Sequence, residues 1–329
     1  MSSLLPAACC LLPAACSLRP GQRTPMLCVL MTAMPTNLRY GQVQLSAMNW
    51  PFFVAETLDC FGEQNLHVER NIFTRPPDPV AALVNGQLDI INVIPDVALL
   101  EIVKGACLTI IANTNDRPQY RLLAHADVQH CGQLEGKRIG VNDGRSAEAL
   151  IMRRLLHRNG LNPESYELVA AGPPPERCEK LKQGSIAATM VTQPFDFLLE
   201  EAGFSVIASS LEAVPTYPFT VCVVRQEQEI DQKFMAFLRA LMKAWGWLAE
   251  PANRPKAVDI RSRATETAPA LAERTYELYL KFTSPPSLEP THEGVATMLD
   301  LLAESGRLPL PLPPARRYVD GRYFEKIGV

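Results

Sequence analysis

The feature that most constrains the fold is an alternation of short apolar runs with longer helical patterns, which begins near residue 38. Runs such as Leu-Asp-Ile-Ile-Asn-Val at 88–93 have the length and composition of buried strands, and the segments between them repeat apolar residues at helical spacing. Glycines such as Gly86 and Gly105 follow the helical segments and mark their C-terminal ends. This order predicts βα units on a largely parallel sheet, so the expected fold class is α/β.

The pattern runs once and then restarts, which predicts two lobes in a chain of 329 residues. In the first run we expect strands at 42–48, 66–73, 88–93 and 108–112 and helices at 51–63, 78–85 and 96–104. In the second run we expect strands at 136–141, 166–169, 186–191 and 206–208 and helices at 146–159, 175–183 and 196–202. The remainder is mainly helical, with helices expected at 231–249, 269–281 and 292–305, and its end should pack back across the lobes.

Two segments with the same helix, glycine, strand plan support this internal repeat. They are 82–90 and 180–188.

Residues 1–37 differ from the rest of the chain, because they hold four of the nine cysteines and the first acidic residue is Glu56. A secretory signal needs a basic residue before its apolar stretch, yet the first one is Arg19. A lipoprotein-like cleavage site ending at Cys16 is also incomplete, because Pro13 stands where an aliphatic residue is expected. We therefore expect a poorly ordered segment or an over-extended gene start, with Met34 as one later start. The sequence contains no stretch of 18 or more apolar residues, so it predicts no transmembrane helix.

Composition argues against nucleic acid as a partner, because 32 basic and 35 acidic residues give a net charge of −3. The cysteines form no CxxC pair, so neither a disulfide framework nor a zinc site is predicted. Cys107 and Cys222 stand in apolar, strand-like runs, where we expect buried free thiols. Such a cysteine content favours a reducing compartment.

Sequence motifs of catalysis are missing: there is no GxGxxG, GxxxxGK[ST], GxSxG or HExxH pattern. We therefore expect no catalytic residue, no cofactor and no metal site. The polar turn Asn142–Ser146 lies between a predicted strand and a predicted helix. Its backbone N–H groups could seat an anion at the helix N-terminus, or Ser146 could simply cap the helix, and both interpretations explain the residue.

Three further polar turns follow predicted strands, at 48–51, 94–96 and 192–194. Ligands of open α/β sheets bind beyond the carboxyl ends of the strands. If the lobes face one another, these turns converge on a common cleft, which is the geometry of a binding site.

Several segments resemble one known family. They are Asn49–Ala55, Gly62, 65–69, 82–90, 134–141, 193–196 and 318–320. Together they are similar to nitrate/sulfonate/taurine-type substrate-binding proteins of ABC transporters over about residues 38–325. Asp59 and Cys60 depart from the family, which usually has glycine before the position of Phe61.

The resemblance implies a type II periplasmic-binding-protein fold with a helical C-terminal extension. Lobe one would comprise residues 38–125 plus 220–329, and lobe two residues 126–219. A small, anionic organic solute would bind between the lobes and pass to an ABC permease. It also implies a periplasmic location, although the malformed signal leaves the cytoplasm open, and we expect a monomer.

The expected ligand contacts come from both lobes. Lobe one would contribute Asn49, Trp50, Phe52, Asp96, Thr114 and Asn115. Lobe two would contribute Gly144, Arg145, Ser146, Thr192, Gln193 and Tyr217, with Arg145 gripping the anion in bidentate fashion.

Two alternatives remain open on the same fold. One is a cytosolic enzyme of the thiamine-pyrimidine synthase or decarboxylase type, for which Asp96 or Asp143 would supply the chemistry. A perturbed pKa at either carboxyl would favour it. The other is a cytosolic ligand sensor, which would explain the poor signal and the free thiols.

Overall fold

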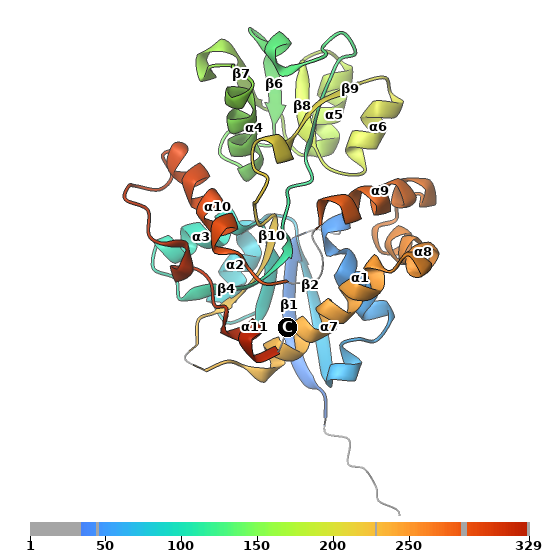
Figure 1. Cartoon of the computed structure of the whole chain (residues 1–329), viewed down its shortest axis with the longest axis vertical. Helices are drawn as coiled ribbons and strands as arrows, with labels where there is room; N and C mark the ends of the chain where they lie inside the picture. The colour runs from blue at the N-terminus through green and yellow to red at the C-terminus, as the bar shows by residue number, and fades with distance from the viewer. Residues whose placement is uncertain (1–33, 44–45, 228, 284–287, 328–329) are drawn as a thin grey trace, which may run out of the picture. The chain divides into compact units, whose positions relative to one another are not determined.

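Two five-stranded sheets organise the chain (Figure 1). The computed structural model describes residues 34–43, 46–227, 229–283 and 288–327, and every structural statement below concerns these residues. The interpretations of residues 1–33 as a leader or an over-extended start lie outside them. From Pro35 onward the chain forms one compact unit.

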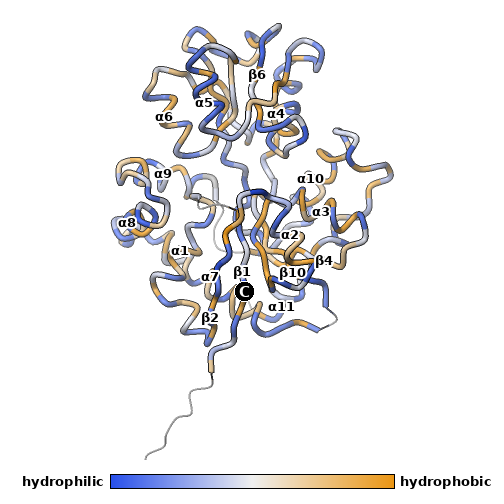
Figure 2. The backbone as a smooth tube through the Cα atoms, turned by 180° about the vertical axis from the view of Figure 1, so that it is seen from behind, coloured by the Kyte–Doolittle hydropathy of each residue, from blue (hydrophilic) through white to orange (hydrophobic). Residues whose placement is uncertain are grey.

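The first sheet has the strand order β2-β1-β3-β10-β4. Its members are β1 (Thr36–Val43), β2 (Leu66–Phe73), β3 (Ile90–Val93), β4 (Leu108–Asn115) and β10 (Thr220–Arg225). Strand β1 pairs in parallel with β2 and β3, and β10 inserts antiparallel between β3 and β4. All eight residues of β4 are buried, as expected for a strand covered on both faces. Figure 2, which colours the backbone by hydropathy, shows apolar (orange) segments beside the labels of β4 and β10.

The second sheet has the order β7-β6-β8-β5-β9. Its members are β5 (Arg121–Ala124), β6 (Arg138–Val141), β7 (Glu167–Ala170), β8 (Ala188–Val191) and β9 (Ser205–Ser209). Here too the strands of the βα units are parallel, and β5 inserts antiparallel between β8 and β9. The two sheets thus share one plan, and the chain crosses from one to the other after β4 and again after β9.

Helices cover both sheets. Those of the first run are α1 (Trp50–Thr57), α2 (Pro77–Val84) and α3 (Pro95–Val103). Those of the second are α4 (Ala147–Arg158), α5 (Pro174–Lys182) and α6 (Phe195–Glu201). The C-terminal helices are α7 (Gln232–Ala249), α8 (Arg254–Thr265), α9 (Pro269–Phe282), α10 (His292–Glu304) and α11 (Arg322–Ile327). No helix in the described part of the chain has the length and apolar character needed to cross a membrane.

The internal repeat is confirmed. Helix α2 and strand β3 form one copy and α5 with β8 the other, and β3 and β8 hold the same third place in their sheets. Gly86 and Gly184 follow the two helices with φ values of 72° and 71°. Because a side chain disfavours this left-handed conformation, glycine ends both helices.

The chain end packs on the edge of the first sheet, as expected. The backbone N–H of Ile110 in β4 donates to the carbonyl of Tyr318 (2.9 Å), and that of Asp320 donates back to Ile110 (2.9 Å). Helix α10 contacts α3 beside the first sheet and α4 beside the second.

Several predictions need correction. The first strand is Thr36–Val43 rather than 42–48, because Ser46 already caps a 3₁₀ turn, so ordered structure also begins before residue 38. The helix expected at 51–63 ends at Thr57. Helix α8 and strand β5 were not expected at all.

The predicted boundary between the lobes at residue 125 and the predicted burial of Cys107 are also wrong. Residues 121–124 form β5 and pair with β8 and β9, so they belong with the second sheet and not with residues 38–120. Cys222 is a buried free thiol as predicted, but Cys107 is exposed, because it precedes the first residue of β4.

Candidate functional site

Polar side chains gather where β3 and β4 end and β10 begins. The Nδ2 group of Asn92 donates to Oγ1 of Thr114 (2.7 Å), which lies 2.8 Å from Oγ1 of Thr220. Asn115 donates through Nδ2 to Thr220 Oγ1 (2.6 Å) and to the carbonyl of Met48 (3.0 Å). The predicted residues Thr114 and Asn115 therefore belong to one buried network at the strand ends.

A small cavity of about 20 Å³ adjoins this network. Its lining includes the predicted residues Asn49, Phe52 and Thr114. The ring of Phe52 stacks on Tyr40, with centroids 4.4 Å apart. A space of this size holds about one water molecule, so the predicted side chains come together here without enclosing room for a solute.

Trp50 points away from that cavity. It is fully buried, its Nε1 donates to the carbonyl of Ala257 in α8 (3.0 Å), and its ring contacts Tyr276 and Tyr279 of α9. Because α1 begins at Trp50, the side chain is directed to the helices rather than to the strand ends. Its predicted place beside Phe52 in an aromatic wall is wrong.

Asp96 lies in the first turn of α3 and is buried. Burial raises the pKa of its carboxyl from the usual 3.8 to about 6, although Arg307 opposes this effect. The Nη1 atom of Arg307 lies 3.5 Å from Oδ2 of Asp96 and donates to the carbonyl oxygen of Arg145 (2.6 Å). Arg307 thus brings two predicted residues together across the two sheets.

The turn Asn142–Ser146 follows β6 and precedes α4. Ser146 caps the helix, since its Oγ accepts from the N–H of Ala149 (3.3 Å), which shows the capping interpretation. The backbone N–H of Arg145 donates to Oδ1 of Asp143 (2.7 Å), and the side chain of Arg145 is exposed. The carbonyl of Gly144 accepts from Arg153 (3.2 Å). The contacts described within this turn do not test the other interpretation, in which its backbone N–H groups bind an anion.

Gln193 follows β8 and is buried, with Thr192 half-buried beside it. The Nε2 group of Gln193 donates to Oδ2 of Asp196 (3.1 Å), which also accepts from Arg121 (3.0 Å). Burial raises the pKa of Asp196, and the hydrogen bond from Arg121 opposes the rise. Gln193 is therefore tied to β5 and α6 by a buried network.

Tyr217 is fully buried and its hydroxyl lies 3.6 Å from the sulfur of Met298 in α10. It packs in the core and does not line the strand-end cavity, and its contact with the solute stays a prediction.

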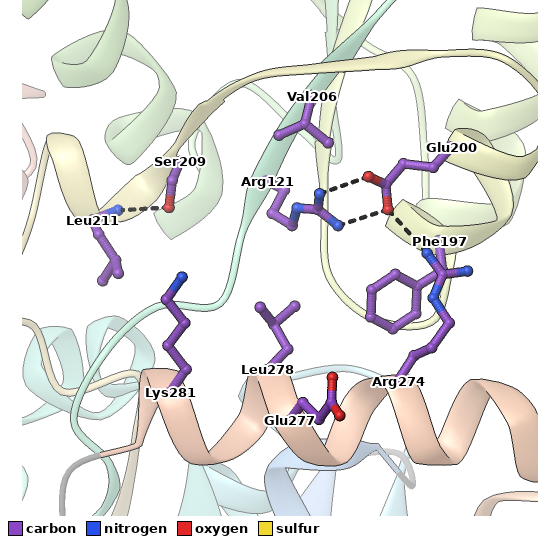
Figure 3. A pocket seen from close by; sticks show the side chains of 10 residues that line it. All are labelled: Arg121, Phe197, Glu200, Val206, Ser209, Leu211, Arg274, Glu277, Leu278 and Lys281. Carbon is purple, nitrogen blue, oxygen red and sulfur yellow. Dashed lines mark hydrogen bonds and ion pairs between the residues drawn. The ribbon is translucent and has the colours of Figure 1, made fainter.

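A groove of about 610 Å³ lies between the second sheet and α9 (Figure 3). Its lining combines apolar and charged side chains. They are Arg121, Phe197, Glu200, Val206, Ser209 and Leu211 from the second sheet and its helices, and Arg274, Glu277, Leu278 and Lys281 from α9. We call this set the α9 groove.

Ion pairs join the two walls of the α9 groove. Arg121 pairs with Glu200 (2.8 Å), and Arg274 of α9 pairs with Glu200 (3.3 Å) and Glu201 (2.7 Å). The Arg274 guanidinium also lies 4.2 Å from the ring centroid of Phe197. The groove can hold a small molecule with an apolar body, and its size lies in the usual range of ligand sites.

Sequence reasoning missed every residue of the α9 groove. Arg121 stands in a strand of four residues, too short to recognise, and the α9 side chains show no motif. The predicted turn 192–194 was the signal nearest to it, because Gln193 and Arg121 share Asp196.

Known proteins resemble the chain at the level of family and fold. A family model described as the NMT1-like family matches residues 31–262. The protein YtlA of Bacillus subtilis (strain 168), named as a binding protein, is 23% identical over 291 residues, which are 84% of this chain and 86% of YtlA.

Solved structures resemble this one over most of their length. The alkanesulfonate-binding protein SsuA from Xanthomonas axonopodis pv. citri, bound to MOPS, has a TM-score of 0.69 and 18% identity, covering 88% of this chain and 99% of SsuA. The periplasmic nitrate-binding protein NrtA from Synechocystis PCC 6803 has a TM-score of 0.69 and 13% identity, covering 89% of this chain and 88% of NrtA. Identities this low show a shared fold, which is that of the periplasmic binding proteins.

The predicted fold is thus confirmed, and because the family model matches more than half of the sequence, the chain belongs to the NMT1-like family.

Proposed function

We propose that this protein is the solute-binding component of an ABC importer and captures a small anionic organic solute, such as a sulfonate or a carboxylate. The observation that carries the proposal is the α9 groove of about 610 Å³, which lies between the second sheet and a helix of the C-terminal extension. A groove between two α/β lobes of one chain can open and close over a solute.

The names of the similar structures support an anionic solute. SsuA is described with MOPS, which carries a sulfonate, and NrtA as a nitrate-binding protein. The α9 groove offers both parts of a site for such a solute. Phe197 and Leu278 can contact an apolar body, and Lys281 is an exposed cation on the same helix as Leu278.

The residues expected from sequence, apart from Trp50, remain our proposed contacts. They are Asn49, Phe52, Asp96, Thr114, Asn115, Gly144, Arg145, Ser146, Thr192, Gln193 and Tyr217. We further propose a first lobe on the first sheet with the C-terminal helices, a second lobe on the second sheet including β5, a periplasmic location, an ABC permease as partner, and a monomer that needs no cofactor.

An enzyme on the same fold is the second candidate, and one observation favours it. The pKa of Asp96 is raised to about 6, which suits a general acid or base at neutral pH. However, Asp96 is buried and lies 3.5 Å from Arg307, and a structural ion pair perturbs a pKa in the same way. We therefore favour binding without covalent chemistry.

The test is a thermal-unfolding screen of the full chain with sulfonates, carboxylates, nitrate and pyrimidines, followed by mass spectrometry of each mixture. A solute at a hundred times its Kd should stabilise the protein by about 2.7 kcal/mol. A stabilising anion recovered unchanged supports the binding protein. A stabilising compound that is consumed supports the enzyme, and a screen in which only pyrimidines or neutral compounds stabilise the protein contradicts the anionic solute.

A further inference from the structure

Two arginines that line the α9 groove already have carboxylate partners. Arg121 pairs with Glu200 (2.8 Å) and with Asp196 (3.0 Å). Arg274 pairs with Glu200 (3.3 Å) and with Glu201 (2.7 Å). All three carboxylates belong to α6. The positive charges at this end of the groove are therefore neutralised within the protein.

Lys281 is a cation of the same groove that has no such partner. It is exposed, and its ammonium group makes neither an ion pair nor a hydrogen bond with the residues that the structure describes. Glu277 stands one helical turn earlier and also lines the groove, but it pairs with Arg254 of α8 (2.8 Å). The groove thus presents one positive charge that is open to a solute.

The open charge and the paired charges lie at opposite ends of the groove (Figure 3). Arg274, Leu278 and Lys281 follow one another at helical spacing, so they share one face of α9, and Figure 3 shows this face turned toward the second sheet. Arg274 lies beside Phe197, while Lys281 extends toward the end of the groove where Ser209 lies. Leu278 stands between the two cations.

Ser209 offers a second donor at the Lys281 end. Its Oγ accepts from the backbone N–H of Leu211 (3.3 Å), and its hydroxyl proton makes no hydrogen bond with the described residues. A serine hydroxyl donates as well as accepts, so this proton is available to an oxygen atom of a solute. Because Lys281 comes from α9 and Ser209 from β9, an anion bound by both would connect the two walls of the groove.

Apolar side chains make up the middle of the lining. They are Leu278 from α9 with Val206 and Leu211 from the other wall, and each is half-buried. A hydrocarbon body that covers them removes apolar surface from water on both sides of the contact, which favours binding. An inorganic ion such as nitrate has no such body and would leave most of the 610 Å³ to water. The lining therefore suits an organic anion.

We propose that the solute is an organic monoanion whose charged group binds between Lys281 and Ser209 and whose apolar body lies on Leu278. The inference rests on the proposed function and deepens it, because it names the cation that selects the charge and limits the solute to one negative group. A second negative group at the other end would approach Glu200, whose arginine partners are already paired. It would lose its hydration without gaining a free cation.

The experiment compares the full-length native protein with Lys281→Met, Lys281→Gln, Lys281→Arg and Lys137→Met. The probes are sodium benzoate, sodium hexane-1-sulfonate, the neutral benzamide, the dianion isophthalate and sodium nitrate, titrated by calorimetry at constant ionic strength. Lys137 is the matched control, because it is an exposed lysine that is absent from the lining of the α9 groove. Since Lys281 is exposed, the thermal midpoints of its variants without solute should lie within about 2 °C of native.

We expect the native protein to bind benzoate or hexane-1-sulfonate at least about 10-fold more tightly than benzamide, isophthalate or nitrate. Lys281→Met and Lys281→Gln should each raise the Kd for the preferred monoanion about 10-fold or more, because a charge-assisted hydrogen bond is lost. Their Kd for benzamide should not change. Lys281→Arg keeps the charge and Lys137→Met keeps the groove, so both should bind within about threefold of native.

The outcomes separate the inference from the proposed function. If the native protein binds an organic anion and both neutral Lys281 variants bind it within about threefold of native, the role of Lys281 is wrong while the proposed function stands. An equal loss for benzoate and benzamide would mean a disturbed groove and would also overturn that role. Tighter binding of isophthalate than of benzoate would contradict the monoanion alone. If no organic anion binds, or benzamide binds as tightly as benzoate, the anionic solute itself is wrong and both proposals fail.

Discussion

Arg307 donates a hydrogen bond of 2.6 Å to the carbonyl oxygen of Arg145. The donor follows α10 and the acceptor follows β6, so the bond ties the C-terminal extension to the second sheet. The same Nη1 atom lies 3.5 Å from Asp96 at the start of α3, beside the first sheet. One guanidinium therefore connects the two sheets at the ends of their strands.

Replacing this guanidinium should destabilise the protein. In Arg307→Met, Asp96 keeps a buried carboxyl without its partner, and the bond to Arg145 is lost. Removing one member of a fully buried pair costs about 3–5 kcal/mol, and because Arg307 is 17% exposed we expect about 2 kcal/mol. Urea unfolding measures the loss. Arg316→Met, at an exposed arginine, should change stability by less than about 0.5 kcal/mol.

Asp96 should make stability depend on pH in an unusual direction. Its pKa is raised from 3.8 to about 6 in the folded protein, so the folded state binds the proton more tightly than the unfolded state. The stabilising contribution is fully present below about pH 4 and is lost as pH rises through 6, with a total of up to about 3 kcal/mol.

The variant Asp96→Asn isolates this effect, because amides do not titrate. Its free energy of unfolding relative to native should increase between pH 4 and pH 7. A difference between variant and native that stays constant over this range would show that Asp96 has an ordinary pKa.

The buried pair of Glu148 in α4 and Arg177 in α5 should behave as a unit. The side chains are 6% and 2% exposed. Glu148→Gln or Arg177→Met alone should each cost about 3–5 kcal/mol, because each leaves an unpaired buried charge. The double variant Glu148→Gln/Arg177→Met should cost less than the sum of the two. Additive losses in urea unfolding would mean that the two side chains do not interact.

The α9 groove should respond to a polar residue at its base. Leu278→Gln should weaken solute-induced stabilisation by about 1–2 kcal/mol, through loss of apolar contact with the solute. Leu198→Gln is the matched control: this leucine, in α6, is 40% exposed and is absent from the lining of the groove. Equal losses in both variants, measured by calorimetry, would place the solute elsewhere.

Because its thiol is exposed, Cys107 should react with alkylating reagents faster than the other cysteines of the described chain. Burial raises the pKa of the thiols of Cys60, Cys131, Cys178 and Cys222, so these should resist alkylation in the folded protein. Brief treatment with iodoacetamide and peptide mapping should find Cys107 modified first. Modification of Cys222 at the same rate would contradict the buried position of β10.

Patterns within single segments could be predicted from the sequence. Leu66–Phe73 is a strand with the expected bounds, and Ser146 caps α4 as its residue type indicates. The repeat of 82–90 and 180–188 was visible because helix, glycine and strand are each local features. The resemblance to substrate-binding proteins predicted the two-lobed fold in which these βα units are combined.

What depends on contacts between distant segments could not be predicted. Strand β5 has four residues and belongs to the second sheet only because β8 and β9 lie on either side of it. Trp50 and Tyr217 look like ligand residues in sequence, yet α8 and α10 bury them. No local signal marks the burial of Arg261, because contacts with segments distant in the sequence, such as Trp50, decide it.

The most direct test of the central claim is isothermal titration calorimetry of the full chain with the anion that stabilises it most in the thermal screen, with mass spectrometry of the solute before and after. We predict saturable binding at one site per chain and complete recovery of the unchanged solute. No saturable binding of any anion, or conversion of the solute during the titration, would contradict the account.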